Sequence, residues 1–154
     1  MTEPLPDFRA PSALEAFFNR AFGFLVGIGV GPSYNFLLEV RGRKSGQIFS
    51  TPVNLLEMNG QRFLVAPRGR TQWVRNAEVS GEVTLKRGSS RRQFRLRALT
   101  DAEKPPVLKE YLERFKTAVQ RYFKVPLGSP AQAFGDVAGN YPVFELMGKD
   151  EPRS

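Results

Sequence analysis

The stretch from residue 35 to residue 65, NFLLEVRGRKSGQIFSTPVNLLEMNGQRFLV, alternates strand-like segments with turn signals and decides the class of fold. NFLLEVR has the pattern of a strand, GRKSG that of its turn, and residues 47–58 that of one antiparallel return strand. The Asn59-Gly60 pair between apolar flanks is the strongest hairpin signal in the chain and leads into a third strand. Pro52 cannot donate to a strand ladder, so we expect the return strand at a sheet edge or a bulge.

Further strands follow downstream. After a loop and a short helix over about 71–79, EVTLKR and RQFRLRAL predict another hairpin around a GSS turn, and YPVFELM predicts the final strand. Consecutive antiparallel strands with peripheral helices indicate an α+β domain. The expected fold is a partly closed barrel of about six mostly antiparallel strands, with helices at the N-terminus, in the middle and near the C-terminus.

Three pairs of residues with capping-box spacing predict where helices begin. The predicted helices cover residues 12–28, about 100–122, and 129–139. We expect residues 1–11 to be a flexible arm, residues 12–148 one domain, and residues 149–154 a tail. The apolar run at 21–30 is too short to span a bilayer, which takes about twenty residues. We expect the first helix to dock on the core, with peripheral membrane contact as the alternative.

Cysteine and histidine are both absent from the 154 residues. A chain without them has no disulfide, no thiolate nucleophile, no ordinary zinc site and no Ser-His-Asp triad. If the protein is an enzyme, we expect a bound organic cofactor to carry the difficult chemistry. The absence of cysteine is compatible with a cytoplasmic location.

The positive charge is concentrated in the middle of the chain. The whole sequence has a net charge of +8, whereas residues 41–97 contain thirteen basic and three acidic residues. The remainder has ten basic and twelve acidic residues. Such a distribution favours an anionic partner, namely a nucleotide-like cofactor, nucleic acid or acidic lipid. The alternative is that basic strands only keep the protein soluble.

The predicted turn at 42–46 is the first candidate anion site. Arg43, Lys44 and Ser45 stand between two glycines, so the turn combines two cations and a hydroxyl with backbone that a ligand can approach closely. We expect the return strand to add Ser50 and Thr51, and a second basic loop, RGR at 68–70, to face the same groove. The alternative is a solvated turn without a ligand.

The remaining candidate site residues are a tryptophan with a nearby asparagine, and two tyrosines. Trp73 anchors the predicted short helix, and Asn76 beside it can cap, pair or bind a ligand. In a chain without histidine, tyrosines are the plausible neutral proton donors, and Tyr122 and Tyr141 are the candidates. The alternative for each tyrosine, and the one we favour, is a packing role. Phe94 alternates with arginines instead of sharing their face, which argues against nucleic acid as a partner.

The stretch RGRKSGQIFSTPVNLLEMNGQRFLVAPRGRTQWVRNAEVSGEVTLKRG, residues 41–88, resembles the nitroreductase-like deazaflavin-dependent oxidoreductases. The shared pattern includes the basic GRKSG turn, the TP of the return strand, and the tryptophan and asparagine of the short helix. The preceding apolar segment and the YPVFEL ending are also similar to that family, so the resemblance covers nearly the whole chain.

The resemblance implies a split β-barrel that binds coenzyme F420, an 8-hydroxy-5-deazaflavin with a phospholactate and oligoglutamate tail. By this resemblance, three residues hold the phosphate and tail, and the others line or support the ring: Arg43, Lys44, Ser45; Ser50, Thr51, Pro52, Val53, Ala66, Pro67, Arg68, Gly69, Trp73, Asn76. Gln72 and Val74 depart from the proline and tyrosine that commonly flank the family's tryptophan, which bears on the substrate.

The implied activity is hydride transfer from the reduced coenzyme to a small acceptor, namely a quinone, a nitro compound or an enone. Related split barrels bind flavin mononucleotide, haem or fatty acids. A non-catalytic carrier of F420, flavin, haem or lipid is therefore the alternative, and a basic nucleic-acid-binding module is the third hypothesis. Flavin mononucleotide ranks below F420 as the cofactor, and both a monomer and a homodimer remain open.

Overall fold

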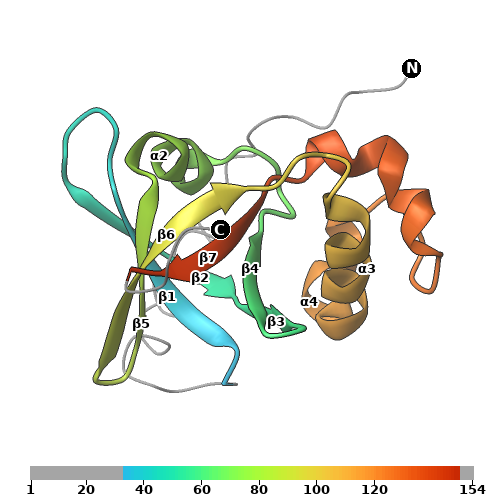
Figure 1. Cartoon of the computed structure of the whole chain (residues 1–154), viewed down its shortest axis with the longest axis horizontal. Helices are drawn as coiled ribbons and strands as arrows, with labels where there is room; N and C mark the ends of the chain where they lie inside the picture. The colour runs from blue at the N-terminus through green and yellow to red at the C-terminus, as the bar shows by residue number, and fades with distance from the viewer. Residues whose placement is uncertain (1–32, 150–154) are drawn as a thin grey trace.

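A computed structural model of the chain describes residues 33–149 (Figure 1). Its seven strands form one antiparallel sheet, so the α+β class is confirmed and the strand number exceeds the expected six by one. The order across the sheet is β2-β1-β5-β6-β7-β4-β3. The strands are β1 (Asn35–Arg41), β2 (Ile48–Asn54), β3 (Leu56–Met58), β4 (Gln61–Val65), β5 (Glu82–Arg87), β6 (Ser90–Ala98) and β7 (Val143–Gly148).

The connection between β2 and β3 forces the sheet to curl. These strands lie at opposite ends of the sheet order, yet only Leu55 separates them in sequence. The two ends of the sheet must therefore approach each other, and Figure 1 shows the resulting curled half-barrel. This architecture is consistent with the expected split barrel. β2 is an end strand, which confirms the edge position predicted from Pro52.

The single return strand predicted over residues 47–58 is wrong, because the segment divides at Leu55. Leu55 and Leu56 are 7% and 0% exposed, and two consecutive buried residues do not fit one alternating strand. The chain bends there, and its second part pairs with β4 instead of β1. The predicted Asn59-Gly60 turn is confirmed, with positive φ angles of 54° and 77° at its two residues.

The helices differ from the predicted continuous segments. They are α2 (Gln72–Ser80), α3 (Lys104–Arg114), α4 (Lys116–Val119), and the 3-10 helices η1 (Gln120–Tyr122) and η2 (Ala131–Asn140). The predicted helix over 100–122 starts later and breaks at Phe115, where φ is −115° and ψ is 25°. The Phe115 ring is buried and lies 4.8 Å from the Tyr34 ring and 5.1 Å from the Tyr111 ring. Aromatic packing at this point accompanies the end of the regular helix.

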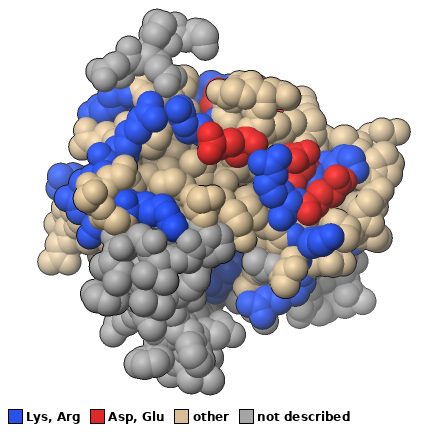
Figure 2. Space-filling model, turned by 90° about the horizontal axis from the view of Figure 1, so that it is seen from below, with Lys and Arg blue, Asp and Glu red and all other residues tan. Residues whose placement is uncertain are grey.

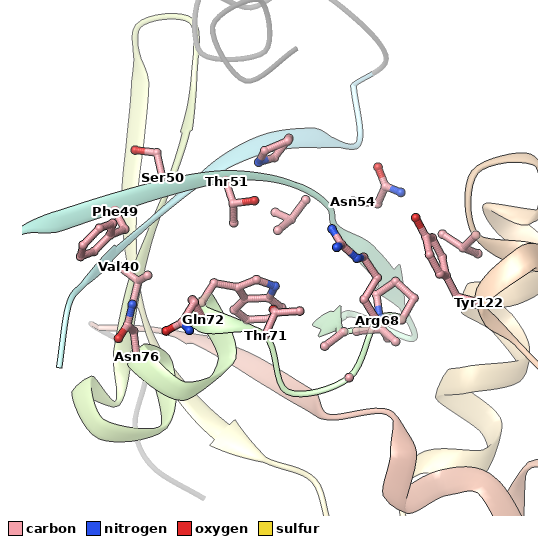
Figure 3. A pocket seen from close by; sticks show the side chains of 18 of the residues that line it. Val40, Phe49, Ser50, Thr51, Asn54, Arg68, Thr71, Gln72, Asn76 and Tyr122 are labelled. Carbon is pink, nitrogen blue, oxygen red and sulfur yellow. The ribbon is translucent and has the colours of Figure 1, made fainter. Parts of the chain in front are cut away.

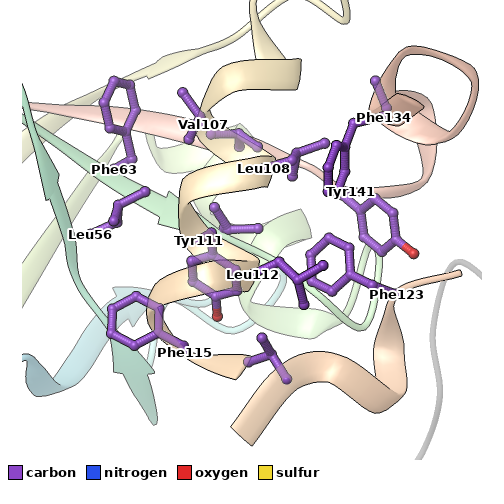
Figure 4. Close-up of a cluster of buried hydrophobic side chains, with 14 of the residues drawn as sticks. Leu56, Phe63, Val107, Leu108, Tyr111, Leu112, Phe115, Phe123, Phe134 and Tyr141 are labelled. Carbon is purple, nitrogen blue, oxygen red and sulfur yellow. The ribbon is translucent and has the colours of Figure 1, made fainter. Parts of the chain in front are cut away.

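Two clusters of buried side chains form the core. The helix-side cluster joins α3 and η2 to β3 and β4, and Figure 4 shows α3 between Leu56 and Phe63 on one side and Phe134 and Tyr141 on the other. The barrel cluster fills the curl of the sheet and includes Leu38, Leu64, Val74, Phe94 and Phe144. Helices α3, α4 and η2 therefore pack on one side of the barrel, whereas α2 contributes Val74 and Ala77 to the barrel cluster.

The first predicted helix, the N-terminal arm, and residues 150–154 of the tail lie outside the described residues. Peripheral membrane contact through that helix is therefore not addressed by the structure. Within residues 33–149, none of the helices has the length and apolar character needed to cross a bilayer.

Candidate functional site

The basic turn between β1 and β2 is closed by its own backbone. The amide of Gly42 donates to the carbonyl of Gln47 at 2.6 Å, and the amide of Gly46 donates to the carbonyl of Gly42 at 3.1 Å. Gly46 has a φ of 74°, in the left-handed region that favours glycine. A Cβ on Gly42 would lie only 2.5 Å from Cε2 of Phe49. The two glycines therefore allow a tight turn with a phenylalanine ring against its backbone.

Helix α2 fixes the orientation of Arg43 in this turn. The Arg43 guanidinium donates through Nη1 to Oδ1 of Asn76 at 2.8 Å and to Oε1 of Gln72 at 3.0 Å. The backbone amide of Arg43 also donates to Oδ1 of Asn76, at 3.1 Å. Asn76 is 4% exposed, and a buried polar side chain of this kind is stabilised by its hydrogen bonds. From the sequence, this turn could equally have been a solvated loop. In the structure it is held by hydrogen bonds to a helix some thirty residues away along the chain.

The loop after β4 forms the opposite wall. Its start is held where the amide of Ala66 donates to the carbonyl of Pro142 at 2.9 Å. Gly69 then adopts a φ of 85°, and its amide donates to the carbonyl of Ala66 at 3.2 Å. This second glycine turn brings Arg68 across from the edge strand β2 (Figure 3). The second basic loop expected from the sequence therefore faces the same space as the first through Arg68 and Gly69, whereas Arg70 does not line the cavity and pairs with Glu78.

A cavity of about 870 Å³ lies between these elements. All thirteen residues that the family resemblance selected as cofactor-binding line this one cavity. Every residue from Phe49 to Asn54 also lines it. Since consecutive strand residues point to opposite faces, an unbroken run means that the cavity borders the edge of β2 and not only one face. An edge strand offers unpaired backbone groups on that side.

The far end of the cavity was not foreseen, apart from Tyr122. Twelve residues beyond the thirteen line the cavity, and they come from β1, β2 and β4, from the turns and loops beside the strands, and from the helices: Tyr34, Asn35, Val40, Gly42, Phe49, Asn54, Val65, Thr71, Gln72, Tyr111, Val119 and Tyr122. Figure 3 places Asn76 and Tyr122 at opposite ends. We call them the basic-turn end (Arg43, Lys44, Ser45, Gln72, Asn76) and the tyrosine end (Tyr34, Asn54, Tyr111, Val119, Tyr122).

The tyrosines at or behind this end have different surroundings. Tyr111 is 2% exposed, and burial raises the pKa of its phenol, against a hydrogen bond with Asn54 that acts to lower the pKa. Tyr122 is half-buried, and its Oη accepts a hydrogen bond of 2.6 Å from Nη2 of Arg121. Because Arg121 is the donor, the phenolic proton of Tyr122 remains available for another acceptor.

Tyr141, the other proton-donor candidate, is fully buried and is not among the residues that line the cavity. Its hydroxyl donates to the backbone carbonyl of Tyr122 at 2.8 Å, and burial raises the pKa of its phenol. Its ring stacks on Phe123 with a centroid distance of 4.4 Å. The structure therefore gives Tyr141 a supporting position behind Tyr122.

The cavity is electrostatically one-sided. Among the described residues that line it, Arg43, Lys44 and Arg68 are cationic and none is acidic. Elsewhere, arginines are paired with carboxylates, as in Arg70–Glu78 at 2.8 Å and Arg97–Glu145 at 3.1 Å. Figure 2 shows one face on which basic side chains gather toward the left while basic and acidic side chains mix on the right. The cavity therefore suits a ligand with negative charge.

The donor set also fits a flat heterocycle with a phosphate-bearing tail. Oγ1 of Thr71 is buried and has no hydrogen-bond partner, although Thr71 lines the cavity. An unpaired buried hydroxyl is unfavourable unless a ligand or water satisfies it. Trp73 adds an apolar wall, held 6.0 Å from the Phe144 ring of the barrel cluster. Across residues 33–149, no group of three or more acidic residues is placed to hold a metal ion.

Comparison with known structures supports the fold. The crystal structure of Atu2129, a protein of unknown function from Agrobacterium tumefaciens, aligns with a TM-score of 0.54 and 21% identity over 94% of this chain. This chain spans only 59% of that protein. An F420-H2 dependent reductase, FDR-A, aligns with a TM-score of 0.52 and 20% identity, over 78% of this chain and 99% of that chain. A protein solved as a domain-swapped dimer aligns with a TM-score of 0.52 and 20% identity, over 86% and 92% of the two chains.

The sequence comparison identifies the family. No curated protein matches the chain significantly. The family model described as F420H(2)-dependent quinone reductase matches residues 17–125, which is more than half of the sequence and includes the basic turn, α2 and Tyr122. The chain therefore belongs to the F420H(2)-dependent quinone reductase family.

Proposed function

We propose that the protein is a reductase that binds coenzyme F420 in this cavity and reduces a small quinone, nitro or enone acceptor there. The observation that carries the proposal is the composition of this cavity: three cations without an acidic residue among its described lining, an edge strand with hydroxyls, and a half-buried tyrosine at the opposite end. Membership of the family supports the coenzyme assignment.

The basic-turn end would hold the anionic part of the coenzyme. Lys44 and Ser45 are exposed at the mouth, and Arg43 is fixed from behind by Asn76. Charge-assisted hydrogen bonds to a phosphate are stronger than neutral ones, so these residues supply most of the orientation. Arg68 adds a further cation from the opposite wall.

The middle of the cavity would hold the ring. Ser50, Thr51, Pro52 and Val53 border it along the edge strand, while Ala66, Pro67 and Gly69 face them from the loop after β4. Thr71 offers its unpaired hydroxyl to a polar ring atom, and Trp73 closes the apolar side. These walls exclude water and fix the distance at which an acceptor can approach.

When bound in its reduced form, the coenzyme supplies the hydride. Reduction of a quinone by a hydride also needs a proton at the acceptor oxygen, and Tyr122 would donate it. Its ring is held by the Arg121 guanidinium, 4.8 Å from the ring centroid, and its backbone carbonyl is held by Tyr141. Because Tyr122 is half-buried, solvent can return the proton after turnover. No nucleophilic side chain is required.

An acceptor screen tests this function. Purified protein is mixed with reduced coenzyme and with one acceptor of each class, and the absorbance of the oxidised coenzyme is followed. We expect oxidation that depends on both protein and acceptor. Tight binding of the coenzyme without turnover of any class would instead indicate the carrier, and would refute the reductase.

A further inference from the structure

Arg43 differs from several arginines of the described region in the kind of partner that holds it. Arg70, Arg91 and Arg97 all pair with carboxylates, at distances of 2.8, 3.2 and 3.0–3.1 Å. A carboxylate neutralises the charge of the guanidinium that it holds. Among residues 33–149, the side-chain partners of Arg43 are the amide oxygens of Gln72 and Asn76, which orient the guanidinium and leave its charge intact.

The Arg43 guanidinium also has N–H donors beyond those that bind Gln72 and Asn76. Both side-chain hydrogen bonds to the amides use Nη1, whereas a guanidinium has five N–H groups in a fixed planar fork. Its backbone amide is held by the same Asn76 oxygen, so the turn and the side chain are fixed together. The remaining edge of the fork is preorganised, and binding an anion there costs little further loss of side-chain freedom.

We propose that Gln72 and Asn76 are positioning residues that hold Arg43 in place as an uncompensated cation for the phosphate-bearing part of the ligand. Asn76 does so from a buried position at the level of the turn, with 4% exposure. Gln72 does so from the exposed first turn of α2. Gln72 therefore sets how strongly the site prefers an anion.

This inference deepens the proposed function and rests on it for the identity of the ligand. It predicts that the loss of ligand affinity depends on whether the side chain at position 72 carries a negative charge. Gln72→Glu keeps a hydrogen-bond acceptor near Arg43 but adds a carboxylate that competes with the ligand. Gln72→Met removes one tether and leaves the charge of Arg43 unchanged. Because Gln72 is exposed, neither variant should prevent folding.

The control is Val79→Glu, which adds the same negative charge to α2. Val79 is 69% exposed and does not line the cavity. Oxidised coenzyme F420 is titrated into all four proteins, and fluorescence reports the dissociation constant. From the Coulomb energy of adjacent charges near a protein surface, we expect Gln72→Glu to weaken binding roughly tenfold, Gln72→Met about threefold, and Val79→Glu less than about twofold.

A second titration with inorganic pyrophosphate separates this inference from the proposed function. The amide chemical shifts of residues 42–46 are followed by nuclear magnetic resonance in the same four proteins. If the natural chain does not bind the coenzyme, the proposed function fails, and the pyrophosphate series still tests the role of Gln72. Equal affinities of Gln72→Glu and Val79→Glu would overturn the inference. A larger loss of affinity in Gln72→Met than in Gln72→Glu would also overturn it. The hydrogen bond to Arg43, and not the charge of its partner, would then determine the affinity.

Discussion

The two ends of the cavity are built in different ways. The basic-turn end uses hydrogen bonds between a glycine-flanked turn and one helix, and Lys44 and Ser45 stand in solvent. The tyrosine end is assembled from aromatic side chains around the helix break at Phe115, with Tyr111 almost fully buried. A solvated cationic end is suited to capturing an anion, and a half-buried phenol such as that of Tyr122 to delivering a proton. Substitutions at the two ends should therefore alter different quantities.

The largest effect is expected at the tyrosine end. Tyr122→Phe removes the phenolic proton while the ring can keep its contact with Arg121. Loss of a positioned proton donor lowers turnover by about 10² or more, and the dissociation constant of the coenzyme should hardly change. Steady-state kinetics with a quinone acceptor and a parallel fluorescence titration measure the two quantities. A kcat within a few fold of that of the natural chain would show that solvent supplies the proton and that the contrast between the ends is wrong.

A smaller effect of the opposite kind is expected at the basic-turn end. Lys44→Ala should weaken coenzyme binding by roughly tenfold at low salt, because it removes a charge-assisted contact. The loss should shrink as salt screens exposed charges beyond a Debye length of about 10 Å at 0.1 M. Lys116→Ala is the matched control, since Lys116 is exposed and does not line the cavity. Thermal melting should be nearly unchanged in both variants, and equal binding by both would mean that the turn is only a loop.

The smallest effect concerns the buried phenol of Tyr111. Burial raises its pKa in the folded state, so its contribution to stability is complete below the unfolded pKa of 10.0 and declines as pH rises above that value. Each pH unit above it costs about 1.4 kcal/mol of unfolding free energy while the phenol stays protonated. Tyr111→Phe should be about 1 kcal/mol less stable at pH 8, through loss of the bond with Asn54, and this gap should close near pH 11. Urea unfolding at both pH values measures the difference in unfolding free energy between the natural chain and Tyr111→Phe. An unchanged difference would contradict the desolvation of the Tyr111 phenol.

The same contrast explains how much the sequence could predict. The basic-turn end follows from local signals, because glycines, a proline and the Asn59-Gly60 turn specify hairpins within a few residues. The strand at 35–41, the edge position of Pro52 and the short helix near Trp73 were all predicted, and the residues selected by family resemblance line one cavity.

The tyrosine end depends on contacts between distant segments. The Tyr34 ring packs against the Phe115 ring, and Asn54 forms a hydrogen bond with Tyr111, so neither role has a signal in its own neighbourhood. Periodicity predicted an unbroken helix through Phe115, because the pattern of apolar residues continues across the break. Likewise, the bend at Leu55 arises from pairing of β3 with β4, which local patterning does not distinguish from a continued strand.

The hydrogen bonds that hold Arg43 were predictable from the sequence only in part. The basic turn was selected as a candidate anion site, and Asn76 as a residue of the supporting helix, yet their direct contact was not predicted. Their separation of 33 residues puts the hydrogen bonds beyond local reasoning. The contact of Arg43 with Gln72, 29 residues away, was likewise not predicted.

The most direct test of the central claim is equilibrium binding of oxidised coenzyme F420 to the purified protein, followed by its fluorescence. We predict saturable binding at micromolar concentrations, with one coenzyme per chain, and much weaker binding to an Arg43→Ala, Lys44→Ala double variant that retains its melting temperature. Absence of saturable binding to the natural chain, or equal binding to the double variant, would contradict the account of the cavity as the coenzyme site.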